Sequence, residues 1–238
     1  MMTSSMIRLE HGRATLALHR LRDAEGPPLL LLHGLRGSSA DWKESGDPDA
    51  WPGSVYAIDF AGHGGSGWLR GGGYHPEIFA ADADLALEEI GTAYVVGAGV
   101  GAYAALLLAG ARPDLVPAAL LLPGRGLDGG GGHPDFFAFA RGFDAELRTL
   151  TSPPEPPPSH DPLVRHAETD VRPPEYASAF AERARRLILV ARDGVAPRWW
   201  TAVVESPAAE AVHGAATRSW SELATAHLLV ASPARDGA

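Results

Sequence analysis

The most informative stretch for chemistry is a glycine-rich pentapeptide, Gly97-Ala98-Gly99-Val100-Gly101, which separates a short apolar run from a helical pattern. Many enzymes place a nucleophilic serine at the middle of such a strand–turn–helix corner. Here the middle residue is Gly99, which has no side chain. The chain contains no cysteine, so a cysteine nucleophile is excluded as well. The corner therefore has the sequence context of a catalytic turn without a group that could attack a substrate.

The segments around this corner alternate between strand and helix patterns. Short strands are expected at 6–10 and 14–20, and apolar runs predict buried strands at 27–34, 55–60, 93–97, 117–124 and 185–194. Helical spacing is found at 75–91 and 100–111, and later at 197–205 and 218–232, with a short strand at 208–214. Strands that alternate with helices predict βαβ crossovers. The expected fold class is therefore α/β, with a mainly parallel central sheet and helices on both faces.

Residues 125–182 differ in character from the rest of the chain. They include "GRGLDGGGGHPDFF" and "TSPPEPPPSHDP", which are rich in glycine and proline. Long connections of this kind often form lids or linkers. We interpret 125–182 as a small cap inserted into a core made of 1–124 and 183–238.

The overall composition narrows the range of partners. The chain has 20 Lys and Arg against 29 Asp and Glu, a formal net charge of −9. This balance argues against nucleic acid and against an anionic membrane surface. The sequence has no apolar run long enough for a membrane span and no signal-peptide pattern at its start. We expect a cytoplasmic protein, with a small molecule as its expected ligand.

Three stretches in order resemble the α/β-hydrolase superfamily. "LLLLHGLRGSSADW" is similar to the loop after the third strand of that family, where a His-Gly-x turn supplies a backbone N–H to the oxyanion hole. "AIDFAGHGGSG" resembles its Asp-x-x-Gly-His-Gly-x-Ser loop, and "VVGAGVGAYAALLLA" stands at its nucleophile elbow. The resemblance covers nearly the whole chain and implies the α/β-hydrolase fold, with 125–182 at the place of the family's variable cap.

The resemblance also implies where a catalytic triad would lie. The nucleophile position is Gly99, and the histidine position after the last strand is Thr217. His213 lies four residues earlier and is a candidate to replace the missing histidine. Asp193, in "LILVARDGVAP", stands at the acid position, although an Asp-Gly pair is equally typical of an ordinary turn. The loss of both nucleophile and base removes covalent acyl transfer.

The backbone of the implied oxyanion hole should survive these losses. We expect the N–H groups of Leu35 and Val100 to point into the pocket, with Gly34 and His33 in the same loop and a cavity enlarged by the missing side chain at Gly99. A helix N-terminus at such a place favours an anion or a carbonyl oxygen. His33 and His63 are expected chiefly to support loops through hydrogen bonds. No histidine spacing predicts a metal site, and no cofactor is implied.

Three hypotheses of function follow. The first is a catalytically degenerate protein that binds a small carbonyl or carboxylate ligand, or acts through a partner. The second is an active hydrolase or lyase of atypical mechanism, in which Asp193 works with His33, His63 or His213 and water is the nucleophile. The third is a structural or interaction subunit whose pocket has collapsed.

Overall fold

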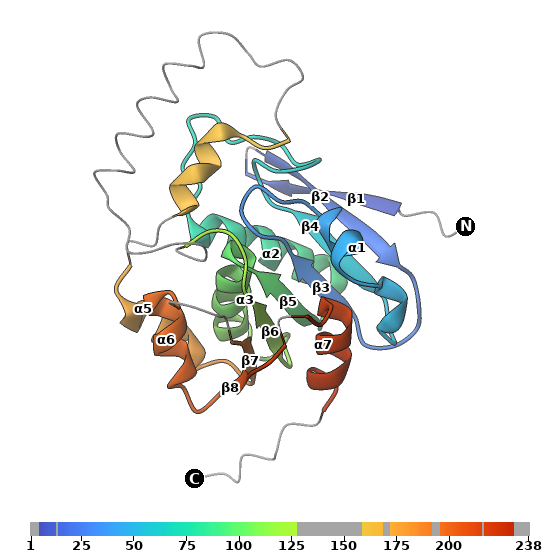
Figure 1. Ribbon diagram of the computed structural model, residues 1–238. Helices are drawn as coiled ribbons and strands as arrows, with labels where there is room; N and C mark the ends of the chain where they lie inside the picture. Colours follow the sequence, from blue (N-terminus) through green and yellow to red (C-terminus); the bar gives the residue numbers. More distant parts are fainter. Residues whose placement is uncertain are drawn as a thin grey trace.

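A single eight-stranded sheet organises the computed structural model, which describes residues 5–12, 14–127, 159–168, 172–191, 196–215 and 217–230. Its strand order is β1-β2-β4-β3-β5-β6-β7-β8 (Figure 1). β1 and β2 are antiparallel, β2 pairs antiparallel with β4, and the remaining neighbours are parallel. The strands are β1 (Ser5–His11), β2 (Ala14–Arg22), β3 (Leu29–Leu32), β4 (Val55–Asp59), β5 (Tyr94–Ala98), β6 (Ala119–Leu122), β7 (Leu187–Val190) and β8 (Ala209–Val212). The predicted α/β class and mainly parallel sheet are confirmed.

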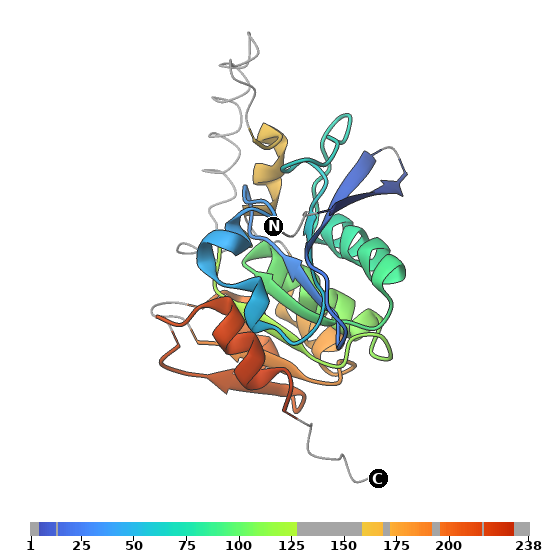
Figure 2. The same cartoon turned by 90° about the vertical axis from the view of Figure 1, so that its right-hand side faces the viewer.

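Helices cover both faces of the sheet. One layer contains α2 (Pro76–Ile90), α3 (Val100–Ala111), α5 (Pro174–Ala181) and α6 (Arg198–Val204), and the other contains α1 (Asp41–Ser45) and α7 (Trp220–His227). Figure 2 shows α1 and α7 on the side of the sheet opposite to α2. Within β3, Leu30 and Leu32 belong to the first apolar cluster, whereas Leu29 and Leu31 belong to the second. Since successive side chains of a strand point to opposite faces, all four leucines are buried, which explains the unbroken apolar run.

The described parts of the predicted cap pack on the core at two places. A 3-10 helix, Pro162–Glu168, follows a segment that lies along the loop after β4, where the Gly64 N–H donates to the Ser159 carbonyl at 3.0 Å. α5 packs on α3 so closely that a Cβ on Gly110 would lie 2.7 Å from the Cα of Phe180. Residues 128–158 and 169–171 lie outside the described residues. The division into a core and a cap at 125–182 therefore stays a prediction.

The strand order determines which loops meet. β5 lies between β3 and β6, and the three strands are parallel, so the loops that follow them leave the sheet at the same edge. β4 adjoins β3 on its other side and adds its own following loop to this group. In the described part of the chain, no helix combines the length and the apolar character that a membrane crossing requires.

Candidate functional site

The corner between β5 and α3 has the backbone geometry of a strained turn. Gly99 has φ 56° and ψ −118°, and α3 begins at the next residue, Val100. A positive φ of this kind costs a residue with a Cβ on the order of 1–3 kcal/mol, whereas glycine adopts it readily. The structure thus contains the predicted strand–turn–helix corner. The assignment of Gly99 as a former nucleophile position stays a prediction.

The two backbone donors expected in the oxyanion hole are already engaged. The Leu35 N–H donates to the Arg125 carbonyl oxygen at 3.1 Å, and the Val100 N–H donates to the same oxygen at 2.8 Å. The two N–H groups converge on one point as expected, but the chain's own carbonyl occupies that point, and their role as donors to a ligand stays a prediction. Arg125 lies in the loop after β6, which ends at Leu122. Its carbonyl oxygen carries a partial negative charge, and two converging N–H groups at the N-terminus of α3 favour such an oxygen.

The space beside Gly99 is also filled. A Cβ on Gly99 would overlap the Arg125 carbonyl oxygen and would lie 2.5 Å from the Arg125 nitrogen and 2.6 Å from the Gly124 carbonyl carbon. The expected enlargement of the cavity at Gly99 is not found among the described residues, because the Gly124–Arg125 backbone occupies the space beside Gly99. Among the described residues, a cavity of about 10 Å³ lies beside Gly99 and is lined by Gly99, Leu122, Pro123, Gly124, Gly126, Pro197, Trp199 and Trp200. That is roughly the volume one water molecule needs.

The loop after β6 is held at both ends. The Gly99 N–H donates to the Leu122 carbonyl at 3.1 Å, at the end of β6. Five residues later, the Leu127 N–H donates to the Ala167 carbonyl at 2.9 Å, and the indole N–H of Trp199 donates to the Leu127 carbonyl at 3.2 Å. Sequence reasoning missed this role because it ended a strand of the core at Gly124 and placed Arg125 and Gly126 in a cap. The available signal was a Pro-Gly-Arg-Gly turn directly after a buried strand.

His33 supports the loops around the hole. Its Nδ1 donates to the Gly34 carbonyl at 2.7 Å, and its Nε2 accepts from the Phe60 N–H at 3.1 Å. The side chain is buried, and burial lowers its pKa, in keeping with a neutral ring. The predicted loop-supporting role therefore agrees with the contacts. Neither ring nitrogen is available to take a proton from water.

His63 has the same double engagement. Its Nδ1 donates to the Ala61 carbonyl at 3.1 Å, and its Nε2 accepts from the Arg36 N–H at 3.1 Å. Burial, together with the neighbouring His33, lowers the pKa of His63 to about 3. The two rings lie 4.9 Å apart. Both histidines thus act as fixed neutral spacers between loops.

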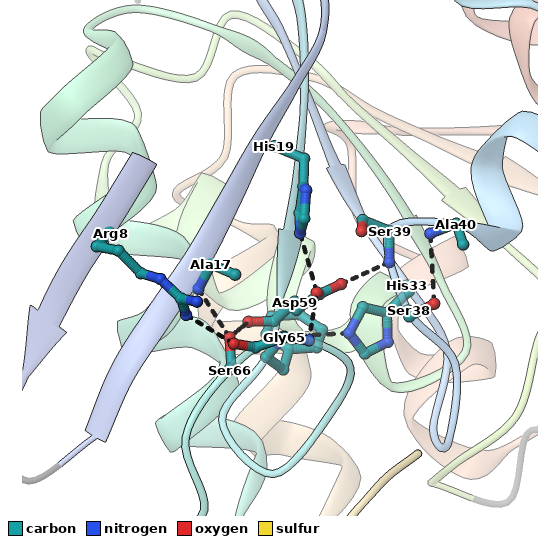
Figure 3. A network of polar contacts seen from close by, with 11 residues as sticks. Arg8, Ala17, His19, His33, Ser38, Ser39, Ala40, Asp59, Gly65 and Ser66 are labelled. Carbon is teal, nitrogen blue, oxygen red and sulfur yellow. Dashed lines mark hydrogen bonds and ion pairs between the residues drawn. The ribbon is translucent and has the colours of Figure 1, made fainter. Parts of the chain in front are cut away.

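A buried carboxylate, Asp59, organises the loop after β4 (Figure 3). It accepts hydrogen bonds from His19 Nε2 at 3.0 Å, from the Gly65 N–H at 2.8 Å and from the Ser39 N–H at 2.7 Å. Burial raises its pKa, but these hydrogen bonds outweigh that effect and hold the pKa well below its usual range. Asp59 is the first residue of the Asp-x-x-Gly-His-Gly-x-Ser stretch, and the sequence predicted no role for it.

Ser66 and Arg8 attach the β1–β2 hairpin to the same loop (Figure 3). The Ser66 hydroxyl donates to the Asp59 carbonyl and accepts from the Ala17 N–H at 2.9 Å. The Arg8 guanidinium donates to the Gly65 carbonyl at 2.7 Å. Ser66 is therefore a structural hydroxyl.

Two further candidate residues, Thr217 and His213, lie at the surface. Thr217 and His213 are exposed, and neither side chain forms a hydrogen bond or ion pair with another described residue. Asp193 lies outside the described residues, so its pairing with any histidine stays a hypothesis. Among the residues that the structure describes, no group of three or more His, Asp or Glu side chains could hold a metal ion.

Comparison of the sequence with known proteins gives a match to an esterase over a short stretch. No protein-family model matches the chain. An esterase of Mycobacterium tuberculosis is 31% identical over 102 residues, a match that spans 40% of this chain and only 32% of the esterase.

Solved structures match over a larger share of the chain. A thioesterase domain from the curacin biosynthetic pathway superposes with a TM-score of 0.68, at 19% identity, over 89% of this chain and 92% of that one. E-2-(acetamidomethylene)succinate hydrolase superposes with a TM-score of 0.61, at 18% identity, over 89% and 91% of the two chains. At these identities the likeness defines the fold and leaves the chemistry to the residues of this chain.

Proposed function

The chain has the α/β-hydrolase fold, and we propose that it is a catalytically degenerate protein of this fold that does not hydrolyse esters or thioesters. One observation carries the proposal: the Gly124–Arg125 backbone fills both the side-chain space of Gly99 and the hole formed by the Leu35 and Val100 N–H groups. A substrate carbonyl would have neither a nucleophile nor an oxyanion hole to enter.

The degenerate triad is part of the same proposal. Gly99 stands at the nucleophile position and Thr217 at the histidine position, with Asp193 at the acid position. The exposed side chain of Thr217 cannot accept a proton from a buried hydroxyl. The contacts of His33 and His63 weigh against an atypical hydrolase or lyase that uses either ring as a base, because all four ring nitrogens already bond to backbone groups.

Because the Arg125 carbonyl occupies the hole, we favour a protein that acts through a partner. We propose that it does so in the cytoplasm, as the sequence leads us to expect. The filled interior at Gly99 supports this reading over a receptor for a small carbonyl or carboxylate ligand. The ligand-binding function remains the second candidate, because two N–H groups already converge on one oxygen. Such a ligand would first have to displace the Arg125 carbonyl.

Hydrolase assays test the proposal directly. The purified protein should release p-nitrophenol from p-nitrophenyl acetate and butyrate, and thiol from an acyl thioester, no faster than buffer does. A fluorophosphonate probe should leave the protein unlabelled, and the same probe reports any contaminating serine hydrolase. Turnover more than about 10⁴ times above background, in a preparation without labelled contaminants, would refute the proposal, since that exceeds the residual rate of an enzyme without its triad.

A further inference from the structure

The loop after β6 has the features of a two-position device. We propose that the Arg125–Gly126 peptide is a reversible internal plug: with its carbonyl inward it closes the hole formed by the Leu35 and Val100 N–H groups, and turned over it opens that hole. The inference rests on the proposed identity of this hole, but it concerns how the hole is closed and does not depend on whether the chain hydrolyses esters.

The first support is that, among the described residues, only the N–H groups of the hole donate hydrogen bonds to this carbonyl. Its oxygen accepts from two N–H groups that have no other hydrogen-bond acceptor among the described residues, the Leu35 N–H and the first N–H of α3 at Val100. The Arg125 side chain is exposed and forms no hydrogen bond with another described residue. The inward position is thus stabilised by two backbone hydrogen bonds at a buried place, and an opened hole needs another oxygen, from water or a ligand, to accept from the two N–H groups.

The second support is the conformation of Gly126, which has φ 100°. Turning a peptide unit over changes ψ of the residue before it and φ of the residue after it, while the Cα atoms stay nearly in place. In the inward position Gly126 requires the positive φ that only glycine adopts without strain. A half turn of the peptide would bring its φ to about −80°, which any residue tolerates. Glycine at this position therefore permits both orientations.

The third support is that the chain on either side is anchored, so the turn can be local. Leu122 is held through its carbonyl by the Gly99 N–H, and Leu127 is held through both its N–H and its carbonyl by Ala167 and Trp199. None of these contacts uses an atom of the Arg125–Gly126 peptide. The hole can accordingly open without release of β6 or of the 3-10 helix Pro162–Glu168.

Gly126→Ala is the variant that should shift the balance. It strains the inward position through the positive φ, and its Cβ would lie 2.9 Å from the Val100 Cβ and 3.1 Å from the Leu35 Cβ. Gly91→Ala is the matched control, since Gly91 has φ 86° but no atom within 4 Å of an added Cβ. Hydrogen–deuterium exchange should be about tenfold faster at the Leu35 and Val100 amides in Gly126→Ala only. The Leu127 amide should stay as protected as in the unmodified chain.

Two outcomes would overturn the inference. One is unchanged protection of Leu35 and Val100 in a folded Gly126→Ala protein. The other is equal acceleration at Leu35, Val100 and Leu127 in both variants, which would report general loosening.

A measurement on the unmodified chain keeps the inference testable if Gly126→Ala does not fold. Scalar couplings across hydrogen bonds, measured by NMR, should link the Leu35 and Val100 nitrogens to the Arg125 carbonyl carbon. Exchange broadening confined to Leu35, Val100, Arg125 and Gly126 should accompany them. Absence of the couplings, or sharp signals throughout, would contradict a reversible plug even if the protein hydrolyses no ester.

Discussion

The elbow at Gly99 and the loop after β4 lie at the same edge of the sheet, and each matches a motif of the α/β-hydrolase fold, yet they are held together differently. Around Asp59, side chains satisfy backbone groups: its carboxylate binds the N–H groups of Ser39 and Gly65, and His33 binds the Phe60 N–H. Around Gly99, backbone satisfies backbone, because the Arg125 carbonyl binds the N–H groups of Leu35 and Val100.

This difference distinguishes a loop held by side chains from a turn held by backbone. A turn can keep its shape without a side chain at its centre if neighbouring backbone occupies the space and accepts hydrogen bonds from the N–H groups around it. A buried side chain that satisfies several backbone N–H groups has no such substitute, because each orphaned N–H costs about 1–3 kcal/mol. The elbow can therefore keep its shape with no working group, whereas the Asp59 loop depends on its side chains.

The strongest test of the comparison removes the carboxylate. Asp59→Ala should lower the free energy of unfolding by about 3–5 kcal/mol, since the buried N–H groups of Ser39 and Gly65 lose their acceptor. Urea unfolding followed by circular dichroism measures the effect. Asp41→Ala is the control, because Asp41 is exposed and accepts from the Ser38 N–H near the surface. A loss below about 1 kcal/mol for Asp59→Ala would remove the proposed contrast.

Restoring a hydroxyl at the elbow should have the next largest effect. Gly99→Ser should destabilise the protein by about 3 kcal/mol, through the positive φ and the overlap of its Cβ with the Arg125 backbone. It should not create esterase activity. Gly91→Ser has the strain without the overlap and should cost about half as much. Equal stability of Gly99→Ser and the unmodified chain would show that the loop after β6 yields easily.

The pH dependence of stability should report His63. Its folded pKa of about 3 lies below the unfolded value near 6.5, so its contribution is complete above pH 6.5 and is lost as the pH falls toward 3. Between pH 7 and pH 5 this amounts to about 2 kcal/mol. Asp59 contributes only below this window, because its pKa is lowered from a value near 3.8.

The comparison of the unmodified chain with His63→Gln isolates this effect. The fall in unfolding free energy from pH 7 to pH 5 should be about 2 kcal/mol smaller in the variant, which has no titrating group at this position. Urea titrations at the two pH values measure it. Parallel pH profiles would mean that His63 titrates normally in the folded chain.

The smallest expected change in the free energy of unfolding is that of a variant at Arg125, next to the Gly99 turn. Arg125→Ala should change the free energy of unfolding by less than about 0.5 kcal/mol, because the side chain is exposed and only the backbone carbonyl enters the hole. Amide exchange at Leu35 and Val100 should stay unchanged. A large loss of stability would show that the guanidinium group, and not the carbonyl, holds the loop.

Much of the fold could be predicted from periodicity alone. The unbroken apolar run of β3 and the helical spacing of α2 correctly indicated a covered parallel sheet, because burial patterns are local properties of a sequence. The glycine-rich composition from Arg125 onward predicted a cap at 125–182, and that division stays a prediction. Gly124, Arg125 and Gly126 belong to a short structured turn on the core, and flexible composition does not distinguish such a turn from a cap.

The sequence by itself determined that the corner between β5 and α3 bends at a residue without a side chain, since the absence of a nucleophile at Gly99 needs no structure to be read. Only the tertiary structure decided what occupies the space beside Gly99. Arg125 is distant from both Leu35 and Gly99 along the chain, and the three meet because β3, β5 and β6 are parallel neighbours whose carboxyl ends share one edge. Two backbone N–H groups need an acceptor there, and the nearest carbonyl supplies it.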